Sequence, residues 1–293
     1  MKSLPAPPTP GSAVDPALRH GVAAGGLHWR LRCEGQGPDL LLLHGTASSL
    51  ASWDGCCRQL RQHFRVWVPD LPGHGQTRLW PDGQASLPRM AQALAALLQA
   101  TGCRPALVAG HSAGAALMLQ LWLDGAIAPR GLLAVNGAVL PLQGLAGWLF
   151  PPLARLLAAS PGLPGFVARR AAQPAALQRL IRSTGSQLDG QGLAHYQQLL
   201  SSGEHVAGAL AMMAGWQLDG LLANLHRVTC PVWLAAAERD ATVPPSQAWE
   251  LARRLPQASV HPLAGWGHLV HEEAPAVVSD CLRALWASVM PRP

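Results

Sequence analysis

The residues most able to do chemistry surround one serine. Ser112 lies in the sequence Gly110-His111-Ser112-Ala113-Gly114, with a glycine two positions to each side. A serine hydroxyl is a weak nucleophile at neutral pH, so it needs a base and donors for the oxyanion that its attack creates. Flanking glycines allow a strand to turn sharply into a helix with the serine at the turn. The pattern predicts a nucleophile at Ser112; the alternative is a serine that only caps the following helix.

The base that activates this serine should be a histidine late in the chain. His268 follows Gly265-Trp266-Gly267, a glycine-bounded loop that can aim its side chain back toward the serine. His271 is the competitor. It lies three residues later, beside Glu272 and Glu273, where a solvated ion pair or the start of the last helix is the expected role. His268 is therefore the predicted base.

The third member is a carboxylate that fixes the tautomer of the histidine and stabilises the imidazolium. Asp240 follows the apolar run 232–237 and precedes the turn Val243-Pro244-Pro245. Glu238 is close, but its side chain should point elsewhere if that of Asp240 points inward, and we expect it to be a solvated loop acid. The chain order is then serine, aspartate, histidine, one of those known for such triads.

Two backbone N–H groups are the expected oxyanion donors. One belongs to Ala113, directly after the serine. The other belongs to Thr46, in the turn His44-Gly45-Thr46 that follows the apolar run 39–43. His44 itself is expected to pack the loop. The glycine-containing segment 69–75 is interpreted as a structural loop without chemistry.

The elements that position these residues follow from hydrophobic patterning. From Gly26 onward, short apolar runs alternate with amphipathic segments, which is typical of a mostly parallel sheet covered by helices. The runs predict strands over 26–33, 39–43, 64–68, 106–109, 131–135, 232–236 and 259–263. Helical spacing predicts helices over 87–100, 113–123 and 274–290.

The segment 137–225 breaks this alternation. It combines prolines with Leu, Ala and Trp and has no convincing strand. We interpret it as a helical cap inserted into a core formed by 21–136 and 226–293, after a flexible N-terminal tail at 1–20. The apolar residues of the cap either bury one helical face on the core or line a pocket for a large hydrophobic substrate.

Composition limits the classes of partner. The chain is 49% hydrophobic and 13% charged, which favours a compact globular protein. Its formal net charge of +6 comes mainly from arginines that are scattered without a run, so no nucleic-acid partner is expected. The basic balance leaves open an attraction to anionic lipid or to a carboxylated substrate.

Cysteine and histidine spacings argue against metal sites. The six cysteines are far apart except for Cys56-Cys57, so neither a zinc site nor a disulfide framework is expected and a reducing compartment is the simplest interpretation. No His, Asp or Glu spacing matches a ligand set, and no metal or other cofactor is predicted. Residues 1–11 lack the apolar stretch of a secretory signal, which favours a cytoplasmic protein.

Several of these motifs together carry a family resemblance. His44-Gly45, the segment 70–75, the elbow 110–114, Asp240 and His268 resemble the α/β-hydrolase superfamily across nearly the whole chain. The resemblance implies an α/β fold with a mostly parallel central sheet, helices on both faces and an inserted helical cap. It also implies a serine hydrolase. One departure is Ala237, where many members of the superfamily carry glycine.

Other stretches are not shared by hydrolases in general. They comprise 127–130, 136–138, 145–147, 183–186, 205–207 and Met212-Met213, and they resemble the magnesium-chelatase accessory proteins of bacteriochlorophyll biosynthesis. That resemblance implies a role beside the enzyme that inserts Mg into protoporphyrin IX. The implied partners are a hydrophobic, porphyrin-related small molecule and a subunit of magnesium chelatase.

Two functions from different classes follow. The first is a serine hydrolase in which Ser112 attacks an ester-type acyl bond, His268 moves the proton and Asp240 orients His268. The second is a non-enzymatic accessory protein or porphyrin carrier for magnesium chelatase, built on a hydrolase fold. In either case, apolar stretches of the cap such as 145–157 suggest peripheral contact with a membrane.

Overall fold

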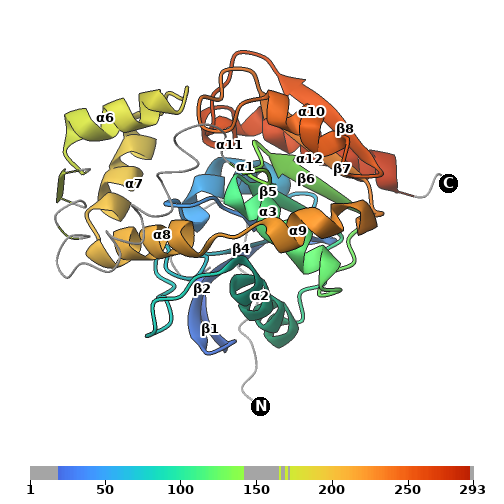
Figure 1. Cartoon of the computed structure of the whole chain (residues 1–293), viewed down its shortest axis with the longest axis horizontal. Coiled ribbons are helices and arrows are strands. Elements are labelled where there is room, and N and C mark those ends of the chain that lie inside the picture. The colour runs from blue at the N-terminus through green and yellow to red at the C-terminus, as the bar shows by residue number, and fades with distance from the viewer. Residues whose placement is uncertain (1–18, 142–164, 166–168, 171, 291–293) are drawn as a thin grey trace.

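The core of the protein is one large sheet. The computed structural model describes residues 19–141, 165, 169–170 and 172–290 (Figure 1). Its eight strands lie in the order β1-β2-β4-β3-β5-β6-β7-β8, antiparallel from β1 to β4 and parallel from β4 to β8. The strands are β1 (Arg19–Ala24), β2 (Leu27–Glu34), β3 (Asp39–Leu43), β4 (Arg65–Pro69), β5 (Leu107–His111), β6 (Gly131–Val135), β7 (Val232–Ala237) and β8 (Ala258–Leu263).

Helices cover both faces of this sheet. Along β3, Leu41 and Leu43 join one core cluster and Leu40 and Leu42 join another, because successive side chains of a strand point to opposite faces. Burial on both faces explains why the parallel strands are continuous apolar runs. The first cluster includes residues of α2 (Leu87–Thr101), α3 (Ala113–Leu123), α9 (Asp219–Asn224) and α10 (Ser246–Ala252); the second includes residues of η2 (Leu50–Trp53), α1 (Asp54–Leu60) and α12 (Pro275–Val289). The predicted fold class is confirmed.

The edge of the sheet differs from the prediction. One strand was expected at 26–33, whereas the structure has a hairpin of β1 and β2 that turns at Gly25 and Gly26, with φ of 58° and 75°. The strand β1 begins at Arg19, inside the range interpreted as a flexible tail. Its sequence has little apolar alternation, so nothing marked it as a strand. The other predicted strands lie within two residues of the observed ones.

The predicted final helix is confirmed within one residue at each end, and a short helix precedes it. The structure has a short α11 (Val270–Glu273) followed by α12, which begins at Pro275. A proline lacks the N–H that an interior helical position donates but is tolerated in a first turn, so the break falls directly before it. This break places His271 on α11, against the core.

The described part of segment 137–225 is helical and contains no strand. It comprises α6 (Pro174–Ser183), α7 (Gly190–Leu200), α8 (Gly203–Gly215) and α9, with η3 (Leu225–Arg227) at its end. In Figure 1, α6, α7 and α8 lie side by side to the left of the sheet. Their apolar side chains pack together in one cluster that includes Leu177, Ile181, Leu199, Val206 and Leu210.

One further property of the helices concerns membranes. Within the described residues, no single helix is both long and apolar enough to cross a bilayer. The helices Gly203–Gly215 and Asp219–Arg227 are bent by 55° at the break between them. Taken together they are long and apolar enough to cross a bilayer, by length and composition only. The apolar segment 145–157, which suggested membrane contact, lies outside the described residues.

Candidate active site

The nucleophile candidate occupies a strained turn. Strand β5 ends at His111 and α3 begins at Ala113, so Ser112 alone joins them, with φ of 51° and ψ of −119°. Residues other than glycine rarely adopt a positive φ, and such strain is typical of functional sites. The turn is held by the Ser112 N–H, which donates to the Val135 carbonyl at 3.0 Å, and by the Ser112 carbonyl, which accepts from the Ala138 N–H at 3.0 Å.

The two elbow glycines are required by close approach. A Cβ at Gly110 would lie 2.4 Å from the Gly114 carbonyl oxygen, and a Cβ at Gly114 would lie 2.5 Å from the carbonyl oxygen of Leu43. Real Cβ atoms do not approach backbone oxygens so closely, so any larger residue would push α3 away from β3 and β5. The glycines therefore set the turn that presents Ser112.

The predicted acid and base are in direct contact. The Nδ1 atom of His268 lies 2.8 Å from Oδ2 of Asp240, and both residues are buried. The other oxygen of Asp240 accepts the N–H groups of Thr242 and Val243, each at 2.8 Å. An ionised carboxylate only accepts hydrogen bonds, so His268 carries its proton on Nδ1 and its Nε2 is left as the basic nitrogen. Glu238 is exposed, as expected.

Two further side chains, which were not among the predicted site residues, tie the base loop to the sheet, one at the end of β6 and one at the end of β5. Asn136, directly after β6, donates through Nδ2 to the carbonyls of Gly267 at 3.1 Å and His268 at 2.9 Å, while its Oδ1 accepts the Ala237 N–H at 2.8 Å. The Nε2 of His111, the neighbour of Ser112, lies 2.9 Å from the same His268 carbonyl and donates to it. The structure thus brings Ser112 and His268 to the same end of the sheet.

The cap takes part in holding the acid and base loops. The Thr184 carbonyl accepts the N–H groups of Ala241 and His268, each at 3.2 Å, and Ser186 Oγ accepts the Leu269 N–H at 2.8 Å. Between them, Gly185 has φ of 81°, and a Cβ there would lie 1.8 Å from the Arg239 carbonyl oxygen. The 184–186 loop therefore lies against the loops that carry Asp240 and His268. In the sequence these residues stood out only through the narrower family resemblance.

The predicted oxyanion loop lies beside the nucleophile. A Cβ at Gly45 would lie 2.9 Å from Ser112 Cβ. The Gly45 carbonyl accepts the Nδ1–H of His44 at 2.8 Å, and in a trans peptide the following N–H, that of Thr46, points the opposite way. Within the described residues neither the Thr46 nor the Ala113 N–H has a hydrogen-bond acceptor. Both are free to bind an external oxygen.

The residues expected to pack loops are buried. The Nε2 atom of His44 accepts the Leu71 N–H at 2.9 Å, and burial lowers the pKa of His44 to about 3, so its ring is neutral. In the segment 69–75, the Asp70 carboxylate accepts the N–H groups of Leu50 at 2.7 Å and Gln76 at 2.8 Å. These contacts hold the loop closed next to η2.

The expected solvated ion pair at His271 is wrong. The His271 ring is fully buried against Trp53 and His111, with ring centroids 4.6 and 4.1 Å away. Burial lowers the pKa of His271 to about 3 and raises that of Glu272 to about 8, so neither is charged at neutral pH. The reason is the separate helix α11, which turns both residues inward. His271 is therefore not available as a solvent-facing base.

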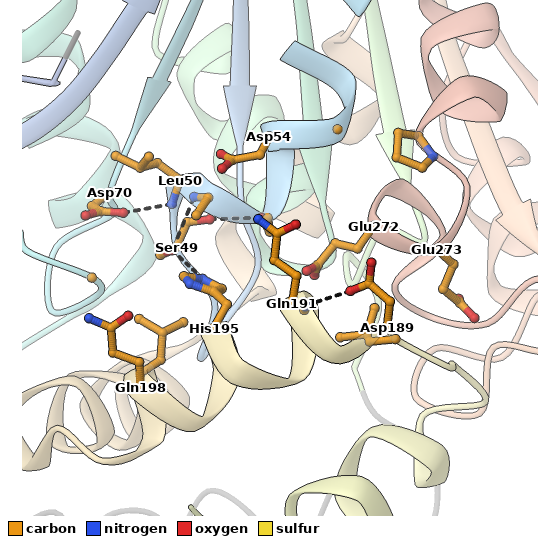
Figure 2. Close-up of a pocket in the computed structure, with 18 of the residues that line it drawn as sticks. Ser49, Leu50, Asp54, Asp70, Asp189, Gln191, His195, Gln198, Glu272 and Glu273 are labelled. Carbon is orange, nitrogen blue, oxygen red and sulfur yellow. Dashed lines mark hydrogen bonds between the residues drawn. The ribbon is translucent and has the colours of Figure 1, made fainter. Parts of the chain in front are cut away.

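A cavity of about 590 Å³ opens beside the base loop, between α7 and the core. Figure 2 shows its polar lining, with His195, Gln191 and Gln198 from α7 facing Asp54 and Glu272 across it. The size suits a small molecule, for which sites of about 300–1,000 Å³ are usual. Ser112, Asp240 and His268 do not line it. Its polarity gives no support to the apolar pocket suggested by the cap sequence.

No metal site is seen in the residues that the structure describes. Among them, no group of three or more His, Cys, Asp or Glu side chains is arranged to hold an ion. The site itself provides a hydroxyl on a strained turn, an oriented imidazole, a carboxylate and backbone N–H groups. This set matches the needs of acyl transfer.

Comparison with known proteins agrees with the fold. The chain is 42% identical over 238 residues to the magnesium-chelatase 30 kDa subunit of Rhodobacter capsulatus, which covers 81% of this chain and 83% of that protein. It is 28% identical over 254 residues to the pimeloyl-[acyl-carrier protein] methyl ester esterase of Nitrosomonas europaea, covering 86% of this chain and 96% of the relative.

Solved structures show the same architecture. A thermophilic esterase from Thermogutta terrifontis superposes with a TM-score of 0.72 over 93% of this chain and 98% of its own, at 24% identity, which shows the shared fold. A model of the alpha/beta hydrolase family matches residues 40–280, the span that runs from β3 through the elbow and both catalytic loops to α12. This chain therefore belongs to the α/β-hydrolase family.

Proposed function

We propose that the protein is a serine hydrolase that cleaves an ester-type acyl bond. Ser112 attacks the acyl carbon, His268 Nε2 takes the hydroxyl proton and returns it to the leaving group, and Asp240 holds the imidazole in the required tautomer. The N–H groups of Thr46 and Ala113 bind the oxyanion. Water activated by His268 then releases the acyl group and restores Ser112.

One observation carries this proposal. The 2.8 Å contact between His268 Nδ1 and Asp240 Oδ2 is buried, and it faces the end of the sheet at which Ser112 holds a positive φ. A structural ion pair would not require a strained serine, and a helix cap would not require an oriented histidine. Similarity to a methyl ester esterase supports an ester of a carboxylic acid as the bond cleaved.

The biological setting follows from the other relative. Because a protein 42% identical to this one is called a magnesium-chelatase subunit, we place the hydrolase in Mg-porphyrin metabolism, the route to bacteriochlorophyll, beside magnesium chelatase. The substrate would be a hydrophobic, porphyrin-related ester. We propose the cytoplasm as the place of action, with a chelatase subunit as a partner.

The test is covalent labelling of the purified protein by a fluorophosphonate, which reacts with activated serines. Labelling should be lost in Ser112→Ala and should slow about 1,000-fold or more in Asp240→Asn, because the histidine then adopts the wrong tautomer. The matched control is Glu238→Gln, which changes an exposed acid two residues away and should label at the native rate. Labelling that persists in Ser112→Ala would exclude the proposal.

A non-enzymatic role is the second candidate, because the name of the chelatase relative describes a subunit and not a hydrolase. Complementation of a deletion strain separates the two functions. Full recovery of pigment by Ser112→Ala would favour a porphyrin carrier. Failure to recover, with a normal amount of the variant protein in the cells, would favour catalysis.

A further inference from the structure

The net charge of the chain is confined to one region. Residues 125–188 contain no aspartate, glutamate or histidine, and their six arginines equal the entire formal charge of +6. The rest of the chain is balanced. The stretch covers the end of the first core segment and the first part of the cap, whose full range 137–225 also contains Asp189, Glu204 and Asp219. These arginines are Arg130, Arg155, Arg169, Arg170, Arg179 and Arg182.

Four of these arginines lie on one helix or just before it in the chain. Arg179 and Arg182 lie three residues apart on α6 and so share a face. That face is opposite Leu177 and Ile181, the two buried residues of the helix. Arg169 and Arg170 are exposed and come just before α6 in the chain. We call Arg169, Arg170, Arg179 and Arg182 the α6 face; Leu180 lies beside it, about 100° around the helix from Arg179.

Nothing in the described residues neutralises this face. No ion pair among the described residues involves any of its four guanidinium groups. Unpaired like charges repel one another, and soluble surfaces usually intersperse both signs. A concentrated positive face is therefore best matched by an anionic partner.

An exposed leucine beside this face limits the kind of partner that would fit it. Leu180 is 48% exposed, one of only three large hydrophobic side chains in the described structure with such exposure. A bilayer with anionic headgroups accepts both guanidinium groups and an apolar side chain, and because its charge is uniform it needs no register with the helix. An acidic protein surface would match the charge but not the exposed leucine. Figure 1 shows α6 at the outer margin of the molecule, where a flat surface can reach it.

We propose that the α6 face docks the protein on the surface of an anionic membrane. Docking would bring the cap, and not the core, against the lipid. The helix leads directly into the 184–186 loop, which contacts the loops of Asp240 and His268, so a docked α6 would be connected to them through three residues. This surface is independent of the proposed hydrolase activity, since it needs no catalytic residue.

The test is flotation of the full chain with vesicles of phosphatidylcholine, with and without phosphatidylglycerol. Each arginine near an anionic surface strengthens binding about fivefold, so Arg179→Gln/Arg182→Gln should weaken it about 25-fold. The matched control is Arg253→Gln/Arg254→Gln, which removes the same charge from exposed positions after α10. Native binding should require phosphatidylglycerol and fall at about 1 M salt, where the Debye length is about 3 Å.

Three outcomes would overturn the proposal. The first is that the native chain fails to float with vesicles of either composition. The second is that both double variants lose binding equally, which would indicate a general attraction to net charge; the third is that the native chain binds immobilised polyglutamate but not vesicles, which would indicate an acidic protein partner. Because all four substituted arginines are exposed, both variants should fold, and circular dichroism checks this directly.

Discussion

The side chain of Asn136 connects the strand before Asp240 with the loop that carries His268. Its amide accepts from the strand that leads to the acid and donates twice to the loop that carries the base, so one residue fixes the spacing of both. Its backbone has a φ of 47°, a conformation that asparagine tolerates better than other non-glycine residues. Because it touches no reacting atom, we regard it as a positioning residue.

An aspartate at this position should make the activity depend on pH in a new way. The ionised carboxylate of Asn136→Asp would face two carbonyl oxygens, which raises its pKa; below that pKa the protonated acid can again donate one hydrogen bond. We expect esterase kcat to fall about 100-fold at high pH, with KM little changed, and the ratio of variant to native kcat to recover as pH falls.

Two variants make this measurement decisive. Asn136→Ala cannot donate at any pH, so its loss of kcat should be the same across the profile. Asn224→Asp changes the other asparagine of the chain, outside the catalytic loops, and should leave the native profile. If Asn136→Asp and Asn136→Ala lose kcat in parallel at every pH, the amide does not position the base.

At the scale of elements, the 184–186 loop joins the cap to the triad. Gly185→Ala would place a Cβ against the Arg239 carbonyl and force a positive φ on alanine. We expect a loss of roughly 2 kcal/mol in the free energy of unfolding. Fluorophosphonate labelling should also slow at least tenfold in the folded variant, because the acid and base loops must move apart.

The control is a glycine one element away. Gly190 begins α7, has no atom within 4 Å of an added Cβ and has no positive φ. Gly190→Ala should leave both urea unfolding and the labelling rate unchanged within error. If the folded Gly185→Ala variant is labelled by the fluorophosphonate at the native rate, the 184–186 loop does not set the geometry of the proposed triad.

The elements of the fold differ in how well the sequence predicts them. The inner parallel strands are buried on both faces and therefore appear in the sequence as apolar runs, and the elbow glycines are sterically required. The strands β3 to β7 and the turn at Ser112 could for this reason be predicted. The strand β1 is a hairpin edge with little apolar pattern and was missed. Asn136 and the 184–186 loop act through contacts across more than 50 residues of sequence, which no local pattern encodes.

At the scale of the whole molecule, stability should depend on Glu272. Burial raises its pKa from 4.5 to about 8 in the folded protein, where its side chain meets the Tyr196 hydroxyl at 2.7 Å. A raised pKa means that the folded state holds a proton that the unfolded state releases. The stabilising contribution is therefore complete below about pH 4.5 and is lost as pH rises through about 8.

Glu272→Gln should remove this dependence, since a glutamine does not titrate but still accepts from Tyr196. Relative to the native protein, the variant should gain stability as pH rises from 5 to 9, by an amount on the order of 1–3 kcal/mol. Urea unfolding at several pH values measures the difference, and the exposed Glu238→Gln is the control. A constant difference across this range would mean that Glu272 is ionised throughout.

The double hydrogen bond to the Thr184 carbonyl has a consequence for how this protein can change over evolutionary time. Caps are often regarded as interchangeable attachments that adapt a fixed catalytic core to new substrates. Here a chimera that received residues 137–225 from a relative would also replace Thr184, whose carbonyl accepts hydrogen bonds from the loops of Asp240 and His268. A change in the cap would therefore also change contacts that hold the loops of Asp240 and His268.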